Sequence, residues 1–170
     1  MTADLYNSMQ KKNISVSFDD YASVDELSQA DRILCDEAEK ALVSSYAPYS
    51  QFKVGAAVLL QSGKIVHGSN QENVAYPSGL CAERVALFSV GAQYPDDSIV
   101  SIAITASSDK FSISNAVTPC GACLQVMSDF EQRQKSPMRV LLYCIGGNVV
   151  VANGVINFLP FQFVEKRLLK

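Results

Sequence analysis

The sequence has no long apolar run and no basic cluster, and each absence argues against one class of partner. No stretch approaches the ~18 consecutive apolar residues of a membrane-spanning helix, so we expect no membrane partner. Residues 1–13 lack the basic-then-apolar pattern of a signal peptide, which predicts a cytoplasmic location. The net charge is −3, and Lys11-Lys12 is too short to be a basic patch. Because neutralising phosphates takes basic patches, no nucleic-acid partner is expected.

Cysteine is also scarce, but its placement is informative. The 170 residues suit one domain with a sizeable core, and they contain five cysteines, an odd number. In a reducing cytoplasm such thiols are available as metal ligands. Three of them fall in two short motifs, CAER at residues 81–84 and PCGAC at residues 119–123. Three thiols and a carboxylate are what a zinc hydrolase needs when three protein ligands leave the fourth position open.

The second motif is predicted to lie at the start of a helix. Thr118 is a plausible N-cap and Pro119 a natural first helical residue, which would place Cys120 in the first turn. There the helix dipole favours the thiolate, the form that binds metal. Cys123 lies three residues further on and therefore shares a helix face with Cys120, so both thiols can bind one ion.

The first motif predicts a second helix start. Cys81 and Glu83 are two residues apart, and such residues point to nearly opposite sides of a regular helix. Both can reach one site only if Cys81 sits at the very start of its helix, after the turn that Pro77-Ser78-Gly79 favours. We therefore predict two helix N-termini that converge on one Zn²⁺ per chain. Glu83 is expected beside the metal and not bound to it.

The rest of the chain predicts an α/β fold with a mixed sheet of about five strands. Residues 1–22 show no clear period and are interpreted as a loosely ordered extension of the domain at 23–170. The small run 55–57 indicates that something closely approaches a strand backbone. Helices are expected over residues 23–46, 80–92 and 119–133. The first begins with a capping box at Ser23, and the second is apolar nearly all round and is therefore expected to be buried. Expected strands are 52–60, 65–70, 99–106, 139–144 and 149–155.

The pairing of C-x-E with P-C-x-x-C resembles the signature of the zinc nucleoside and nucleobase deaminases in its three-cysteine form. Three neighbouring runs narrow the resemblance: PYSQFKVGAA at 48–57, NQEN at 70–73 and Tyr76-Pro77. Over roughly residues 24–163 the chain closely resembles the small homotetrameric cytidine deaminases. The resemblance implies a three-layer α/β/α sandwich and hydrolytic deamination of cytidine and deoxycytidine in pyrimidine salvage. The implied partners are the nucleoside, water and three further copies of the chain.

The resemblance also assigns roles to individual residues. It implies that Asn70 and Glu72 bind the ribose, which their spacing of two in extended chain allows but does not decide. It implies that Glu83 carries protons during the reaction. Phe163, three residues after the proline of an L-P motif, is expected to reach the pocket of a neighbouring subunit. The resemblance also implies that Phe52 flanks the nucleoside and that Tyr76 lies near the pocket contributed by a neighbouring subunit; Ala82 is the remaining residue implied at the substrate.

Charge balance singles out Arg84. Three thiolates overcompensate the +2 charge of zinc, and in related three-cysteine enzymes the arginine after the glutamate contacts the ligand sulfurs. An exposed helix arginine is the alternative interpretation. The family often has arginine directly after the second cysteine of P-C-x-x-C, where this chain has Leu124, followed by the usual Gln125. This departure leaves local packing or subunit contacts open.

Two further side chains were weighed as metal ligands. His67 is the only histidine, and many deaminases of this superfamily use one histidine ligand. Because Cys81 occupies that ligand position here, His67 is interpreted as an ordinary strand residue. Cys35 lies beside an apolar helical stripe and is interpreted as a core thiol. Cys144 falls in a predicted strand and is expected to be packed.

Three alternative functions stay open. Blasticidin-S deaminases share the metal motifs, so that antibiotic is a rival substrate, although the four residues Phe52, Asn70, Glu72 and Tyr76 favour a nucleoside. A polynucleotide deaminase lacks the support of a basic segment. A non-enzymatic, zinc-stabilised interaction module would need a fourth protein ligand that closes the metal site.

Overall fold

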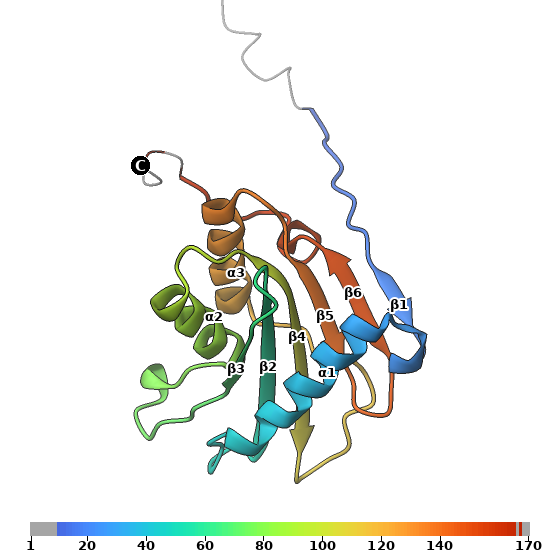
Figure 1. Cartoon of the computed structure of the whole chain (residues 1–170), viewed down its shortest axis with the longest axis vertical. Coiled ribbons are helices and arrows are strands. Elements are labelled where there is room, and N and C mark those ends of the chain that lie inside the picture. Colours follow the sequence, from blue (N-terminus) through green and yellow to red (C-terminus); the bar gives the residue numbers. More distant parts are fainter. Residues whose placement is uncertain (1–9, 166, 168–170) are drawn as a thin grey trace, which may run out of the picture.

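One mixed sheet of six strands runs through the molecule, which is described here by a computed structural model of residues 10–165 and 167 (Figure 1). The strand order is β1-β6-β5-β4-β2-β3. Only β4 and β5 pair in parallel among these strands; the other neighbours are antiparallel. The strands are β1 (Asp19–Tyr21), β2 (Phe52–Leu60), β3 (Ile65–Ser69), β4 (Ile99–Ser108), β5 (Arg139–Tyr143) and β6 (Val149–Asn153).

Helices cover both faces of this sheet. Helix α1 (Gln29–Ala41) crosses one face, and α2 (Ala82–Gln93) and α3 (Gly121–Gln134) lie on the other (Figure 1). Side chains along β2 alternate between two apolar cores, as a pleated strand requires. Ala56 and Val58 belong to the core under α2 and α3, whereas Ala57 belongs to the core under α1. The predicted three-layer α/β/α sandwich is confirmed. Within the described residues, no helix is long and apolar enough to cross a membrane.

Two glycines let the helices approach the sheet closely. A Cβ atom at Gly55 would lie 2.1 Å from the carbonyl oxygen of Ala38 in α1, which confirms the close approach predicted from the small run 55–57. A Cβ atom at Gly68 in β3 would lie 2.4 Å from the carbonyl oxygen of Ala82. Gly68 therefore seats the first turn of α2 on the sheet, directly after Cys81.

The N-terminal part differs from the prediction. Asp19–Tyr21 is a sixth strand, at the edge of the sheet, and it pairs with β6. The prediction of a loosely ordered extension over residues 1–22 is therefore wrong from Asp19 onward. Residues 1–9 of that extension lie outside the described part of the chain. The expected helix from Ser23 is also wrong at its start. Ser23 caps only a 3₁₀ turn, Val24–Glu26, and the chain then becomes extended at the buried Leu27. Helix α1 begins after a second cap, in which the Ser28 hydroxyl accepts from the Asp31 N–H.

Helix α2 is less buried than its composition predicted. Its inward face is covered, with Ala82, Ala86 and Leu87 fully buried. Phe88, however, is 47% exposed. An all-round apolar helix in a single chain can bury only the face that packs on the sheet, so one side of α2 presents apolar surface.

Candidate active site

Two helix N-termini meet at the three cysteines, as the spacing predicted. Cys81 is the N-cap residue of α2 and Cys120 that of α3, and both have extended backbone, with φ −71° and ψ 153° or 161°. Cys123 is the third residue of α3. The three sulfur atoms all lie within 4.8 Å of one another. The predicted cap at Thr118 is wrong by two residues: the Cys120 carbonyl accepts the first helical hydrogen bond, from the Leu124 N–H.

The electrostatics of this cluster suit a metal cation. A hydrogen bond with the Cys123 thiol is the main cause that lowers the pKa of Cys81 to about 5, and Arg84 adds to it from 3.5 Å. The pKa of Cys123 is raised, first by the same hydrogen bond and then by burial. The protein alone therefore stabilises one thiolate and keeps the other thiol neutral. A soft divalent cation would allow all three to ionise, so the donor set fits the predicted metal.

Glu83 lies beside the thiols at the closed end of the cavity. It is the second residue of α2 and only 4% exposed. Its Oε2 atom is buried and has no hydrogen-bond partner among the described residues. Burial is the main cause that raises the pKa of this carboxyl group. A buried, unpaired carboxylate is costly unless something at the site uses it. Glu83 is not one of the three clustered ligands.

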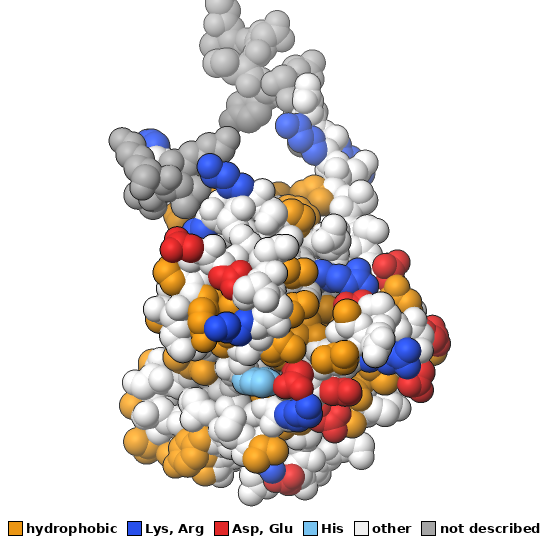
Figure 2. Space-filling model, viewed as in Figure 1, with side chains coloured by type: hydrophobic (Ala, Val, Ile, Leu, Met, Phe, Trp, Pro, Cys, Tyr) orange, Lys and Arg blue, Asp and Glu red, His pale blue; other side chains and the backbone are white. Residues whose placement is uncertain are grey.

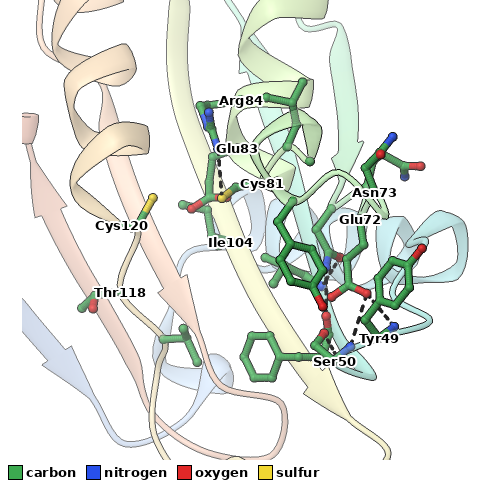
Figure 3. A pocket seen from close by; sticks show the side chains of 18 residues that line it. Tyr49, Ser50, Glu72, Asn73, Cys81, Glu83, Arg84, Ile104, Thr118 and Cys120 are labelled. Atoms are coloured by element: carbon green, nitrogen blue, oxygen red, sulfur yellow. Dashed lines mark hydrogen bonds between the residues drawn. The ribbon is translucent and has the colours of Figure 1, made fainter.

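A cavity of about 880 Å³ leads from the cysteines to the surface (Figure 3). Figure 3 shows Cys81, Glu83 and Cys120 at one end and Tyr49, Ser50 and Glu72 at the other. The predicted site residues that line it are Phe52, Asn70, Glu72, Tyr76, Cys81, Glu83, Arg84 and Cys120. The structure does not bring Ala82 to this cavity: the whole residue is fully buried in the core and is not among the lining residues. Phe163 does not line the cavity of its own chain.

Asn70 and Glu72 line the cavity, but not through the strand geometry that was predicted. Strand β3 ends at Ser69, and Gln71 and Asn73 line the cavity as well, so alternation along a strand does not explain the placement. Hydrogen bonds to the preceding segment hold both side chains instead. The Glu72 carboxylate accepts from the backbone N–H of Tyr49 at 2.8 Å and of Ser50 at 3.3 Å. Hydrogen bonding, first from the Ser50 hydroxyl, lowers the pKa of Glu72.

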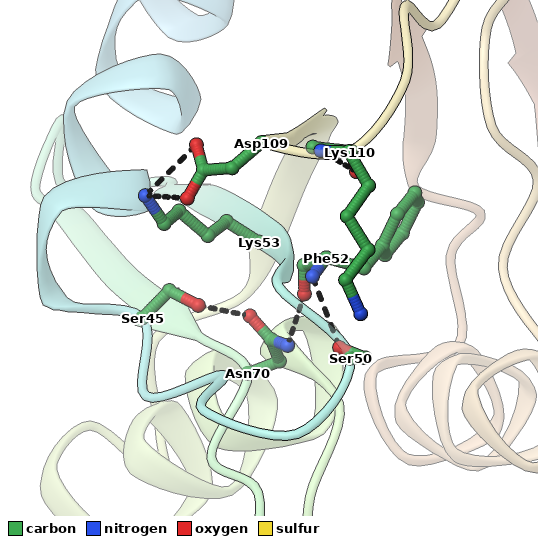
Figure 4. A network of polar contacts seen from close by, with 8 residues as sticks. Ser45, Ser50, Phe52, Lys53, Asn70, Asp109 and Lys110 are labelled. Carbon is green, nitrogen blue, oxygen red and sulfur yellow. Dashed lines mark hydrogen bonds and ion pairs between the residues drawn. The ribbon is translucent and has the colours of Figure 1, made fainter.

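The Asn70 amide is oriented unambiguously by its neighbours (Figure 4). Its Oδ1 accepts from the Val54 N–H at 2.8 Å and from the Ser45 hydroxyl, and its Nδ2 donates to the Phe52 carbonyl at 2.9 Å. One N–H of the amide is left to donate elsewhere. Asn70 therefore ties the start of β2 to the end of β3.

Aromatic rings border the open end of the cavity. Tyr49 and Tyr76 meet edge to face with 6.0 Å between ring centroids, and Tyr76 is 77% exposed. The Phe52 ring stacks on Phe111 at 6.1 Å. The sequence analysis did not identify Phe111 as a neighbour of the site. Tyr49 was missed too, although its place in the run 48–57, beside Phe52, was the available signal.

Residues 28–136 match the family model described as the cytidine and deoxycytidylate deaminase zinc-binding region. The chain belongs to this family. Over 135 residues it is 42% identical to the cytidine deaminase of Sporosarcina psychrophila, covering 79% of this chain and 92% of the relative. The cytidine deaminase of Halalkalibacterium halodurans is 42% identical over 98 residues, 58% of this chain and 70% of the relative. A crystal structure of cytidine deaminase from Burkholderia pseudomallei matches with a TM-score of 0.68 at 37% identity, covering 81% and 100% of the two chains.

Within this deaminase family, the departure at residue 124 can now be placed. Leu124 is 7% exposed and packs in the core shared by α2, α3 and the sheet. An apolar side chain is therefore suited to this position. The neighbouring Gln125 is half-buried and makes hydrogen bonds to Phe163, near the C-terminal end of the described chain.

The residues interpreted as non-ligands lie outside the metal cluster. His67 is in β3, and its Nε2 lies 2.7 Å from a carboxylate oxygen of Glu37 in α1. Figure 2 shows the histidine beside acidic side chains on the outer face. Cys35 is fully buried under α1, where burial is the main cause that raises the pKa of its thiol to about 12. Cys144 is buried as well, directly after β5. These three predictions are confirmed.

Proposed function

We propose that the chain catalyses the hydrolytic deamination of cytidine and deoxycytidine to the corresponding uridines and ammonia, as a step of pyrimidine salvage. The observation that carries the proposal is the buried Glu83 carboxyl group, whose Oε2 has no hydrogen-bond partner among the described residues, beside three clustered thiols at the closed end of a cavity of nucleoside size. Membership of the deaminase family and relatives that are themselves cytidine deaminases support the choice of substrate.

Cys81, Cys120 and Cys123 would hold one Zn²⁺ ion, which when bound supplies a water molecule of lowered pKa. Glu83 is the one carboxylate at this end of the cavity among the described lining residues. It accepts one proton from the attacking water and delivers it to N3 of the pyrimidine as the C4–O bond forms. It then takes the second proton from the hydroxyl group now on C4 and delivers it to the amine, which leaves as ammonia when the C4–N bond breaks. Its raised pKa suits a group that must both take and return a proton. Arg84, 3.5 Å from the Cys81 sulfur, offsets the surplus negative charge of three thiolates.

The open end of the cavity is suited to a sugar. The remaining N–H of Asn70 is a donor, and the Glu72 carboxylate is an acceptor. A hydroxyl group can accept from the first and donate to the second, and a ribose offers such hydroxyls. Phe52 adds a flat apolar wall on which a nucleoside can pack.

We further propose that the working form is a homotetramer with shared active sites. Support comes from apolar surface that one chain leaves uncovered: Tyr76 at the cavity opening is 77% exposed, Phe163 is 73% exposed and Phe88 on α2 is 47% exposed. Soluble proteins commonly cover such groups in an interface, and closed two-fold symmetry is the usual solution. Phe163 would then complete the pocket of a neighbouring copy.

Ultraviolet monitoring of the purified, zinc-loaded protein tests the proposal. Cytidine and deoxycytidine should be converted to the uridines, and free cytosine should be a very poor substrate because it leaves the sugar-binding groups unpaired. Preferential turnover of blasticidin S would identify the rival substrate. No turnover of any aminopyrimidine, together with a metal spectrum showing a fourth protein ligand, would instead identify a zinc-stabilised interaction module.

A further inference from the structure

The Gln125 side chain forms a two-point contact with the backbone of Phe163. Its Nε2 donates to the Phe163 carbonyl at 2.9 Å, and its Oε1 accepts from the Phe163 N–H at 3.0 Å. The amide thus pairs with one residue as a neighbouring strand would. One turn further along α3, the Ser128 hydroxyl lies 2.9 Å from the Gln162 side-chain oxygen and donates to it. These bonds attach residues 158–163, here called the C-terminal segment, to α3.

The segment is not held in place by burial of its last two aromatic rings. Phe158 and Leu159 pack against the core, but Phe161 is 83% exposed and Phe163 is 73% exposed. Ordering a residue costs conformational entropy, and here hydrogen bonds offset that cost although the ring gains little contact in its own chain. The geometry of Phe163 is therefore fixed while its apolar ring stays available to another molecule.

The anchor point belongs to the same helix as the metal cluster. Gln125 is two residues after Cys123, and the intervening Leu124 is buried in the core. Gln125 therefore attaches the C-terminal segment to the beginning of α3, close to the three clustered cysteines. The two hydrogen bonds use only the Phe163 backbone, so they set the position of the residue and leave its side chain uncommitted.

We propose that Gln125 is a positioning residue, which holds the C-terminal segment so that Phe163 enters the nucleoside pocket of a second copy of this chain. The exposed aromatic Tyr76 at the opening of that pocket is a complementary contact for the ring. This inference rests on the proposed function. It adds that a side chain that touches neither metal nor substrate controls substrate affinity through the backbone of Phe163.

The test compares Gln125→Leu with Gln132→Leu, a matched change at an exposed glutamine of the same helix. Gln125→Leu should raise KM for cytidine about tenfold, the order expected when one or two net hydrogen bonds are lost. The turnover number and zinc content should stay parental. Hydrogen exchange at the Phe163 amide should become faster. Gln132→Leu should leave KM, turnover, zinc content and exchange unchanged. Gln125→Glu keeps the hydrogen-bond acceptor but loses the donor, so its KM should lie between those of the parent and Gln125→Leu. This second variant also provides the test if Gln125→Leu does not fold.

A double-mutant cycle with Phe163→Ala decides whether Gln125 acts through Phe163. The single change Phe163→Ala should raise KM, and adding Gln125→Leu should raise it little further, because the two residues act as one unit. Additive increases in KM for the two substitutions would overturn the proposal. So would a Gln125→Leu protein whose Phe163 amide exchanges faster while KM stays unchanged, or one whose exchange at Phe163 stays unchanged. If the parental protein does not deaminate cytidine at all, the proposed function fails instead, which distinguishes the two failures.

Discussion

The two ends of the cavity are built differently. At the metal end, Glu83 is 4% exposed and Cys123 fully buried, and two helix N-termini of one chain enclose them. At the open end, Tyr76 is 77% exposed and lies in a 3₁₀ turn outside the sheet. The comparison teaches that the buried chemical groups and the exposed aromatic groups are separated along one cavity, with Cys120 the exposed member of the metal cluster.

Hydrogen bonding follows the same division. At the metal end, Glu83 Oε2 and Arg84 Nε are buried without partners among the described residues. At the open end, the polar atoms of Asn70 and Glu72 are paired with the backbone of the preceding segment. The unpaired atoms of Glu83 and Arg84 face the cavity and can bind a ligand there, whereas the paired groups at the open end also maintain the local fold. Substitutions at the metal end should therefore affect chemistry alone, and those at the open end should affect recognition and local structure together.

The largest effect should follow removal of a thiol from the metal end. Cys123→Ala should abolish both zinc binding and deamination, because two remaining ligands cannot hold a catalytic zinc site. Cys144→Ala, which removes a buried thiol outside the cluster, should keep both. Zinc per chain, measured by atomic spectroscopy alongside activity, provides the check. A Cys123→Ala protein with a parental zinc content would refute the ligand assignment.

Next in size is the loss expected when Glu83 can no longer carry protons. Glu83→Gln should keep about one zinc per chain while activity falls at least ~10²–10⁴-fold, the range typical of general acid–base catalysis. Glu131→Gln is the matched control, since Glu131 is a partly buried carboxyl group of α3 that does not line the cavity. Near-parental turnover of cytidine by Glu83→Gln would rule out the proton-carrying role.

The metal end was largely predictable because short spacings determine it. Cys120 and Cys123 are three residues apart and share a face on a helix, whereas Cys81 and Glu83 are two apart and reach one site because Cys81 stands at the start of its helix. Only the cap at Thr118 was wrong. Sequence rules favour threonine as an N-cap, whereas the helix here begins after Cys120.

The parts of the fold and of the site that the sequence did not predict depend on contacts between residues that are distant in sequence. Strand β1 has only three residues, two of them aspartate, and it exists because β6 pairs with it. Gln125 and Phe163 are 38 residues apart, and no local pattern connects them. The stack of Phe111 on Phe52 likewise joins two segments through space. Such contacts follow from the tertiary fold, and a single sequence does not encode them in a readable period.

A third prediction tests recognition at the open end. Glu72→Gln should lower kcat/KM for cytidine far more than for free cytosine, because only the nucleoside has the sugar that Glu72 is proposed to bind. Ser50→Ala, which removes a hydroxyl partner of Glu72 but not the carboxylate, should have a smaller effect. Equal losses on both substrates in Glu72→Gln would mean that the variant disturbs the cavity wall and not sugar recognition.

The smallest effect expected is on the pH dependence of folding, and two carboxyl groups should show it with opposite signs. The pKa of Glu72 is lowered from 4.5, first by the Ser50 hydroxyl and then by backbone N–H groups. The Glu72 carboxylate therefore stabilises the fold above pH 4.5, and this contribution to the free energy of unfolding is lost as the pH falls through the lowered pKa. Glu72→Gln should be less stable than the parent near neutrality, and the difference should vanish on acidification.

Glu131 provides the opposite case. Burial raises its pKa from 4.5, although its Oε1 accepts from the backbone N–H groups of Met138 and Val155. Its contribution is present at low pH and is lost as the pH rises through the raised value, where the buried carboxylate becomes charged. Glu131→Gln should thus be more stable than the parent near neutrality and equal to it in acid. Urea unfolding of both variants, expressed as differences from the parent so that zinc loss in acid cancels, tests both signs. Parallel pH profiles for the two variants would contradict the difference between Glu72, whose pKa is lowered by hydrogen bonds, and Glu131, whose pKa is raised by burial.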